Sequence, residues 1–146
     1  WNVLAAALPL KVDDHRSYAP ANPLAIAGWV TLTTSGTTSG IIERPGDIEV
    51  IRWNATVGTT KNVSITTKGN VDAQVDVYQW KASPTNAYQL IATFSPTGNV
   101  QVPASNFTVN STGWTGTGYF IVRQATNTPY ATSPRWLTGQ WTLTYN

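Results

Sequence analysis

Apolar and polar residues alternate along much of this chain. The clearest alternation covers 71–81, where Val71, Ala73, Val75 and Val77 fall on one face and the residues between them are polar. A period of two is typical of a β-strand that buries one face. The same pattern predicts about nine strands, over 24–34, 47–57, 62–68, 71–81, 87–94, 100–103, 107–111, 118–125 and 139–145.

Short runs of Gly, Pro, Asn and Ser separate these segments. The run 35–40 indicates a break in the strand pattern, and the pair Gly69-Asn70 predicts a two-residue hairpin between the strands on either side. Strands that recur at intervals of roughly 8 to 15 residues, with turn signals between them, are typical of sandwiches and barrels. We therefore expect one all-β domain over 24–146, an antiparallel, jelly-roll-like β-sandwich with no helix.

The first twelve residues form an apolar stretch, which the polar, proline-bearing segment 13–23 separates from the rest. Read with a period of two, one face of this stretch is apolar throughout. Its members are Leu4, Ala6, Leu8, Leu10 and Val12. An extended segment with such a face could fill a hydrophobic groove on another molecule. We therefore expect 1–12 to be a donor strand and 13–23 to be its linker.

Other interpretations of 1–12 stay open. The stretch could form a short helix that ends at Pro9, or an ordinary first strand of its own subunit. It lacks the basic start of a signal peptide, and twelve residues are too few to cross a bilayer as a helix. We expect no membrane span.

Charged residues make up only 11% of the chain, and the net charge is +2. The cations are isolated from one another, so we expect no nucleic-acid binding. Instead, 23 Thr, 9 Ser and 11 Asn supply polar side chains, and Thr favours strands over helices. The chain has no Cys and no Met, which excludes disulfides and leaves few side chains that oxidise easily. This composition indicates a secreted protein at the cell surface.

The sequence offers little catalytic chemistry. His15 is the single histidine and lies in the linker, so the common Ser-His and Cys-His triads could be built only around it. Glu43 and Glu49 are the only glutamates and could serve as a glycosidase pair, although solubility explains them as well. We expect no enzymatic activity, no catalytic residue and no cofactor.

Two groups of acidic residues could in principle bind a metal ion. Asp13, Asp14 and His15 are adjacent, but neighbouring side chains rarely converge on one ion, and a solvated linker explains them. Asp72 and Asp76 fall on the face of their strand that we expect to meet solvent, and their spacing is not that of a calcium loop. We expect no metal site.

The chain is rich in aromatic residues, with seven Trp and six Tyr. Aromatic rings on the face of a sandwich can stack on sugars, whereas most aromatics pack in cores and interfaces. The sugar-stacking candidates are Trp53, Trp80, Trp114 and Trp136.

Four sequons for N-glycosylation occur along the chain. They begin at Asn54, Asn62, Asn106 and Asn110. N-linked glycans on these four residues would suit a secreted protein.

Several segments of the body match a known family in their pattern. They are Asp47-Ile-Glu-Val-Ile-Arg-Trp53, Val75-Asp-Val-Tyr78, Gly118-Tyr-Phe-Ile-Val-Arg123 and Gly139-Gln-Trp-Thr-Leu143. On these segments the body resembles the secreted bacterial and archaeal β-sandwich called the pre-peptidase C-terminal domain. The resemblance implies a jelly-roll-like sandwich in an extracellular setting and no catalytic residue.

The arrangement of the whole chain resembles the subunits of archaeal extracellular threads and bundling pili. Those proteins combine a Thr-rich sandwich, sequons and an apolar N-terminal strand on a short tether. The resemblance implies a structural, adhesive filament of copies of this chain, each donating its first strand to its neighbour, with Leu4, Leu8, Leu10 and Val12 filling the groove. The alternative is a secreted carbohydrate-binding module, or an accessory module of a larger extracellular enzyme.

Overall fold

The computed structural model describes residues 31–42, 47–69, 71–96, 101–125 and 139–146. These residues form strands and turns, with no helix among them, so the expected all-β class is confirmed. The strands are β1 (Thr31–Thr33), β2 (Gly36–Ile42), β3 (Ile48–Asn54), β4 (Thr60–Gly69), β5 (Ala73–Lys81), β6 (Ala87–Phe94), β7 (Gln101–Thr108), β8 (Trp114–Gln124) and β9 (Gly139–Tyr145).

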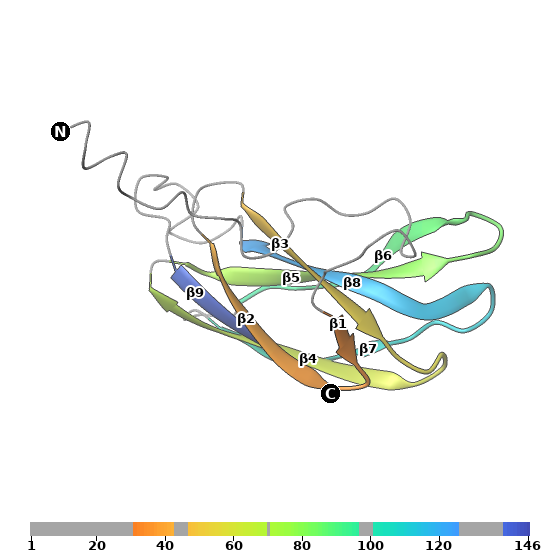
Figure 1. Cartoon of the computed structure of the whole chain (residues 1–146), viewed down its shortest axis with the longest axis horizontal. Helices are drawn as coiled ribbons and strands as arrows, with labels where there is room; N and C mark the ends of the chain where they lie inside the picture. The colour runs from red at the N-terminus through yellow and green to blue at the C-terminus, as the bar shows by residue number, and fades with distance from the viewer. Residues whose placement is uncertain (1–30, 43–46, 70, 97–100, 126–138) are drawn as a thin grey trace.

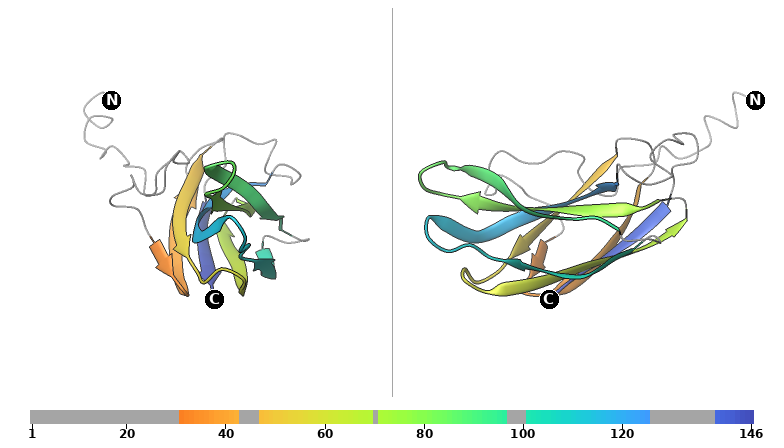
Figure 2. Two further views of the ribbon diagram at one scale, coloured as in Figure 1. Left: turned by 90° about the vertical axis from the view of Figure 1, so that its right-hand side faces the viewer. Right: turned by 180° about the vertical axis from the view of Figure 1, so that it is seen from behind.

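The strands form two sheets that pack face to face as a sandwich (Figure 1). The larger sheet has the order β1-β3-β8-β5-β6, and the smaller has the order β2-β9-β4-β7. All pairs are antiparallel except β1 with β3. Seen from one end, β1 and β2 lie on one side of the sandwich and β6 and β7 on the other (Figure 2).

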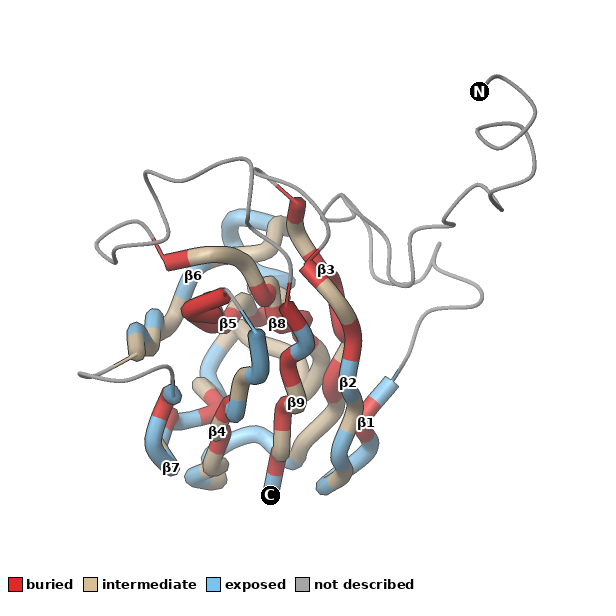
Figure 3. Tube along the Cα trace, turned by 90° about the vertical axis from the view of Figure 1, so that its left-hand side faces the viewer, coloured by how far each residue is buried: buried red, intermediate tan, exposed pale blue. Residues whose placement is uncertain are grey.

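The core lies between the sheets and is built by alternating residues of the central strands. On β5 the odd positions from Ala73 to Val77 are fully buried, as the sequence predicts. On β9 the alternation from Trp141 to Tyr145 is equally regular, and all three odd positions have no exposed surface. Burial is therefore concentrated in the central strands, while the residues of the outer strands are mostly half-buried or exposed (Figure 3).

The predicted hairpin at Gly69-Asn70 is wrong. β4 pairs with β7 and β9, whereas β5 pairs with β6 and β8, so the chain passes from one sheet to the other between them. Both strands carry an apolar face, with Val63 and Ile65 on β4 and Val75 on β5, and all three side chains are buried. Placing the strands in opposite sheets lets each apolar face cover the other.

Two further expectations about strands need correction. The run 35–40, expected as a break, is most of β2, and the two separate segments 100–103 and 107–111 are one strand, β7. β2 is made mainly of Gly, Thr and Ser, and it forms because all seven of its residues pair with β9. Pairing with a neighbouring strand therefore outweighs the weak local propensity of these residues.

The polar face of β5 does not meet solvent, contrary to our expectation. Asp72, Gln74 and Asp76 are at most 6% exposed. Asp76 accepts hydrogen bonds from Gln74 Nε2 at 2.9 Å and Thr93 Oγ1 at 3.0 Å, and it pairs with Arg123 Nε at 2.8 Å. These donors allow the carboxylate to be buried in its charged form.

Candidate functional site

Several residues singled out from the sequence lie outside the described part of the chain. They are the whole predicted donor strand 1–12 with Leu4, Ala6, Leu8, Leu10 and Val12, the linker 13–23 with Asp13, Asp14 and His15, and the separate residues Glu43 and Trp136. The expected boundaries at 12 and 23 stay predictions for the same reason.

Trp53 is not a sugar-stacking residue, because its side chain has no exposed surface. Its ring lies 5.6 Å from Phe107, 6.0 Å from Phe120 and 6.3 Å from Tyr145, measured between ring centroids. Trp53 is therefore at the centre of an aromatic core, where rings at such separations stabilise one another.

The candidate acidic residues in the described segments are all enclosed. Glu49 is fully buried, and Asp72 and Asp76 are nearly so. No group of three or more His, Cys, Asp or Glu within the described residues could hold a metal ion. No helix among those residues is long and apolar enough to cross a membrane.

Four aromatic residues gather on the outer face of the larger sheet. Tyr78 stacks on Tyr119 with centroids 4.7 Å apart, and Tyr88 meets Tyr119 edge-on at 4.4 Å. Trp80 packs edge-on against Tyr88 at 5.0 Å. Burial raises the pKa of Tyr88 to about 12, with the nearby Arg52 guanidinium acting in the opposite direction. Burial, and the neighbouring tyrosines, also raise the pKa of Tyr119.

Trp114 lies apart from this cluster. It is half-buried, and the Lys81 ammonium lies 5.1 Å from the centre of its ring. A cation over a ring face is attracted by the ring quadrupole. Of the three predicted sugar-stacking residues that the structure describes, Trp80 and Trp114 keep some exposed surface, and the two occupy different places.

The four sequons differ in their surroundings. Asn106 is exposed on β7, an edge strand. Asn62 lies opposite it on β4, and its side-chain oxygen is buried. Asn54 accepts a hydrogen bond from Thr117 through its side chain. Asn110 is half-buried in the turn after β7, where its backbone is bound by a side chain of β5.

The described sheets have four edge strands, and two of them carry features that discourage pairing with another chain. β1 is only three residues long, and β7 contains Pro103 together with a register shift against β4. β2 and β6 contain neither proline nor a charged residue. Uncharged, proline-free edges are the usual templates for strand addition.

β6 is the more apolar of these two edges. Leu90, on its outer face, is 53% exposed, which is the largest exposure among the big hydrophobic residues of the described chain. Ile91, Ala92 and Phe94 pack against the core and are only partly buried. We did not predict a site on this strand, although the absence of any charge from 87 to 94 was a visible signal.

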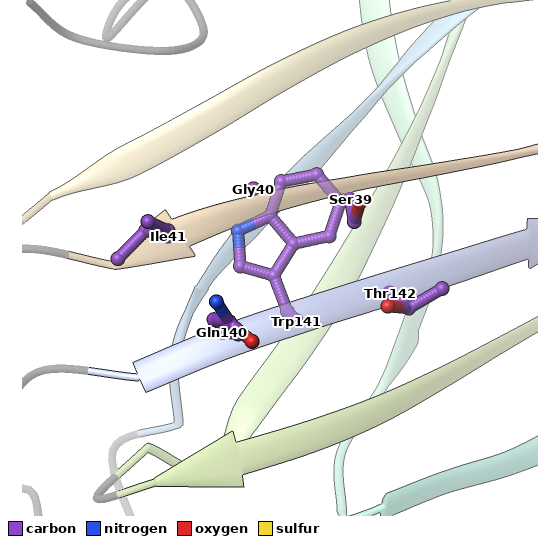
Figure 4. Close-up of a pocket in the computed structure, with 6 residues that line it drawn as sticks. All are labelled: Ser39, Gly40, Ile41, Gln140, Trp141 and Thr142. Atoms are coloured by element: carbon purple, nitrogen blue, oxygen red, sulfur yellow. The ribbon is translucent and has the colours of Figure 1, made fainter.

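β2 has a different character. A hollow of about 320 Å³ lies where it pairs with β9, and its lining includes Ser39, Gln140 and Thr142. In Figure 4 the Trp141 indole reaches from β9 across Gly40 of β2, between Ile41 with Gln140 at one end and Ser39 with Thr142 at the other. Three of the six lining residues, Ser39, Gln140 and Thr142, carry polar side chains, so this hollow suits an apolar strand less well than β6 does.

Comparison with solved structures identifies a similar fold. The pre-peptidase C-terminal domain of collagenase from Bacillus anthracis aligns with 88% of this chain and 99% of its own, with a TM-score of 0.57 and 13% identity. The two proteins share a β-sandwich fold. The resemblance of the body to this domain is thereby confirmed at the level of the fold.

Two more distant similarities concern the periplasmic inhibitors of g-type lysozyme named PliG. The inhibitor from Aeromonas hydrophila has a TM-score of 0.45 and 16% identity, over 80% of this chain and 95% of its own. The inhibitor from Salmonella Typhimurium has a TM-score of 0.46 and 15% identity, over 80% and 96%. No protein-family model matches the chain, and a comparison with curated proteins gives no match.

Proposed function

We propose that this protein is a secreted structural subunit of an extracellular filament, a pilus or thread, that assembles by donating residues 1–12 to the neighbouring subunit. The observation that carries the proposal is the apolar, uncharged edge strand β6 with the exposed side chain of Leu90. Such an edge is prone to pair with another chain. The same protein contains a separate apolar segment of a length suited to strand addition.

The geometry of strand donation favours a filament. A segment of twelve residues spans about 40 Å when extended, at about 3.3 Å per residue, which is enough to cross a sandwich. Each subunit donates one strand and accepts one at a different place on its surface. Such a contact is heterologous and does not close on itself, so subunits add in a line. The filament would carry N-linked glycans, need no cofactor and have no enzymatic activity.

The experiment compares the full chain with a variant that lacks residues 1–12, by electron microscopy of both purified proteins. The proposal expects filaments from the full chain and dispersed particles from the shortened one. Circular dichroism establishes that the shortened protein is folded. Dispersed, folded particles from both proteins would contradict the proposal.

A second function, a secreted module that binds carbohydrate, is favoured by the aromatic cluster around Trp80 and Tyr88 on the outer sheet face. An accessory role in a larger enzyme is consistent with the shared fold, since the similar domain is part of a collagenase. Retention on insoluble polysaccharide by the full chain, and its loss in Trp80→Ala, would support this function. Trp114→Ala serves as the comparison, because Trp114 lies outside the cluster.

A further inference from the structure

The two sheets do not cover each other equally. The larger sheet has five strands and the smaller has four, and their last strands, β6 and β7, meet on the same side of the sandwich. β7 also contacts β5, so it is shared between two strands of the opposite sheet. The end-on view shows β6 and β7 together on that side (Figure 2). Within the described residues, the inner face of β6 therefore lacks a full layer of strands beneath it.

The side chains on the inner face of β6 are accordingly only partly covered. Phe94 and Ala92 lie opposite Val75 and Val77 of β5, and both of those valines are fully buried core residues. On β6 the corresponding side chains, with Ile91, contact the core but are only partly buried. Apolar surface that is left half in water favours a further apolar segment.

On the opposite side of the sandwich, the core beneath β2 is covered. At β2 the inward positions end in Ile42, which has no exposed surface, and Gly40 is buried. At the start of β2 the Leu32 side chain occupies this face, because a Cβ added to Gly36 would lie 2.9 Å from Leu32 Cδ2. No large half-buried apolar side chain on the described part of β2 faces the core. An incoming apolar strand would gain little there.

Building on the proposed function, we infer that residues 1–12 of a second copy pack their apolar face onto Ile91, Ala92 and Phe94 of β6. Segment 1–12 suits the inner face of β6 in three ways. Its alternate side chains are uniformly apolar, and so are Ile91, Ala92 and Phe94, the β6 side chains that contact the core. Its extended length of about 40 Å exceeds the roughly 26 Å of the eight residues of β6. Neither surface presents a buried charge to the other, so no ion is stripped of water on contact.

Because the chain has no cysteine, paired cysteines test this contact directly. Leu4, Leu8 or Leu10 is replaced by Cys, one at a time, together with Ala92→Cys on β6 or Thr38→Cys on β2. Thr38 is a matched control, because it is also half-buried and lies opposite the core residue Leu143. A disulfide forms only where two Cα atoms approach within about 7 Å. Each double-cysteine variant is oxidised under filament-forming conditions, and its products are separated by denaturing, non-reducing electrophoresis. The same sample is examined by electron microscopy.

The inference expects a ladder of covalent dimers, trimers and larger species with at least one Ala92→Cys pair and none with the Thr38→Cys pairs. Filaments that give a ladder only with Thr38→Cys, or with neither, would overturn the inference and leave the proposed function intact. Covalent closure within single chains, with no filaments, would overturn both.

Charge substitutions give a second readout that needs no oxidation. Ala92→Asp places a carboxylate in the apolar contact and is expected to abolish filaments, while Thr38→Asp leaves them unchanged. Circular dichroism and thermal melting of both variants establish that the sandwich is folded. Filaments that persist in folded Ala92→Asp would contradict the inference.

Discussion

The side-chain amide of Gln79 both donates to and accepts from the backbone of Asn110, as the backbone of a paired strand residue does. Gln79 Oε1 accepts from the Asn110 N–H, and Gln79 Nε2 donates to the Asn110 carbonyl, both at 2.9 Å. Nε2 also donates to the Thr115 carbonyl at 2.9 Å. Gln79 is fully buried, and it thereby fixes the turn between β7 and β8 to β5.

We expect Gln79→Met to lower the free energy of unfolding by about 2–3 kcal/mol, because the variant leaves backbone groups of Asn110 and Thr115 without a partner. Urea-induced unfolding measures the change. Gln89→Met is the matched control, since Gln89 lies opposite Gln79 in the register and bonds only to exposed Thr85 at 3.3 Å in the described structure. Equal losses in the two variants would show that the amide has no special role.

The ion pair between Asp76 and Arg123 should stabilise the larger sheet. The Arg123 side chain is 33% exposed and that of Asp76 only 8%, so solvent screens the pair in part. We expect Arg123→Met to cost about 1–3 kcal/mol, because a nearly buried carboxylate then keeps only the donors of Gln74 and Thr93. Urea unfolding of both proteins gives the value.

A double variant separates the lost attraction from the penalty on the remaining charge. Asp76→Asn in the Arg123→Met background removes the unpaired carboxylate while keeping the size of the side chain. We expect the double variant to be more stable than Arg123→Met alone. If adding Asp76→Asn destabilises the protein further, the carboxylate is not the source of the loss.

Alkaline pH should unfold the protein through its buried tyrosines. Burial raises the pKa of Tyr145, whose hydroxyl donates to the Asn54 carbonyl at 3.0 Å, and it raises the pKa of Tyr88 to about 12. A raised pKa means that the folded protein holds the proton more tightly than the unfolded chain does. The contribution of these tyrosines to the free energy of unfolding is therefore complete below about pH 10, the pKa of tyrosine in the unfolded chain. It is lost as the pH rises toward 12.

The measurement is a joint titration by circular dichroism and tyrosinate absorbance. We expect tyrosine ionisation and unfolding to occur together above about pH 10. Tyr145→Phe should make the decline in stability with pH less steep, because one linked group is gone. Complete ionisation of all six tyrosines with the sandwich still folded would contradict this account.

Glycan occupancy should follow exposure. We expect Asn106 to be modified, because it is exposed on an edge strand, and Asn62 to be unmodified, because it is half-buried on β4, which is paired on both sides. The test compares the intact mass of the protein from its native host with the masses of the Asn106→Gln and Asn62→Gln variants. Asn106→Gln should lose one glycan mass and Asn62→Gln none. A glycopeptide that maps to Asn62 would count against the prediction.

The sequence by itself determined the fold class and most of the strands. Period-two alternation located β5 and β9. Each of these strands buries one apolar face, and the alternation that produces this face is visible in the sequence. β6 was predicted with its observed bounds, because Pro84 before it and Pro96 after it limit the run. These features are local, so they can be read without knowing what packs against them.

Only the tertiary structure decided which partners the strands have and which side chains are enclosed. β2 exists because β9 pairs with it, and no local pattern contains that information. Trp53 and Trp80 look alike in the sequence, yet one lies at the centre of the core and the other on an outer face. Burial depends on the sheet that covers a strand, which is a long-range property. For the same reason, the half-buried inner face of β6 became visible only when the two sheets were placed together.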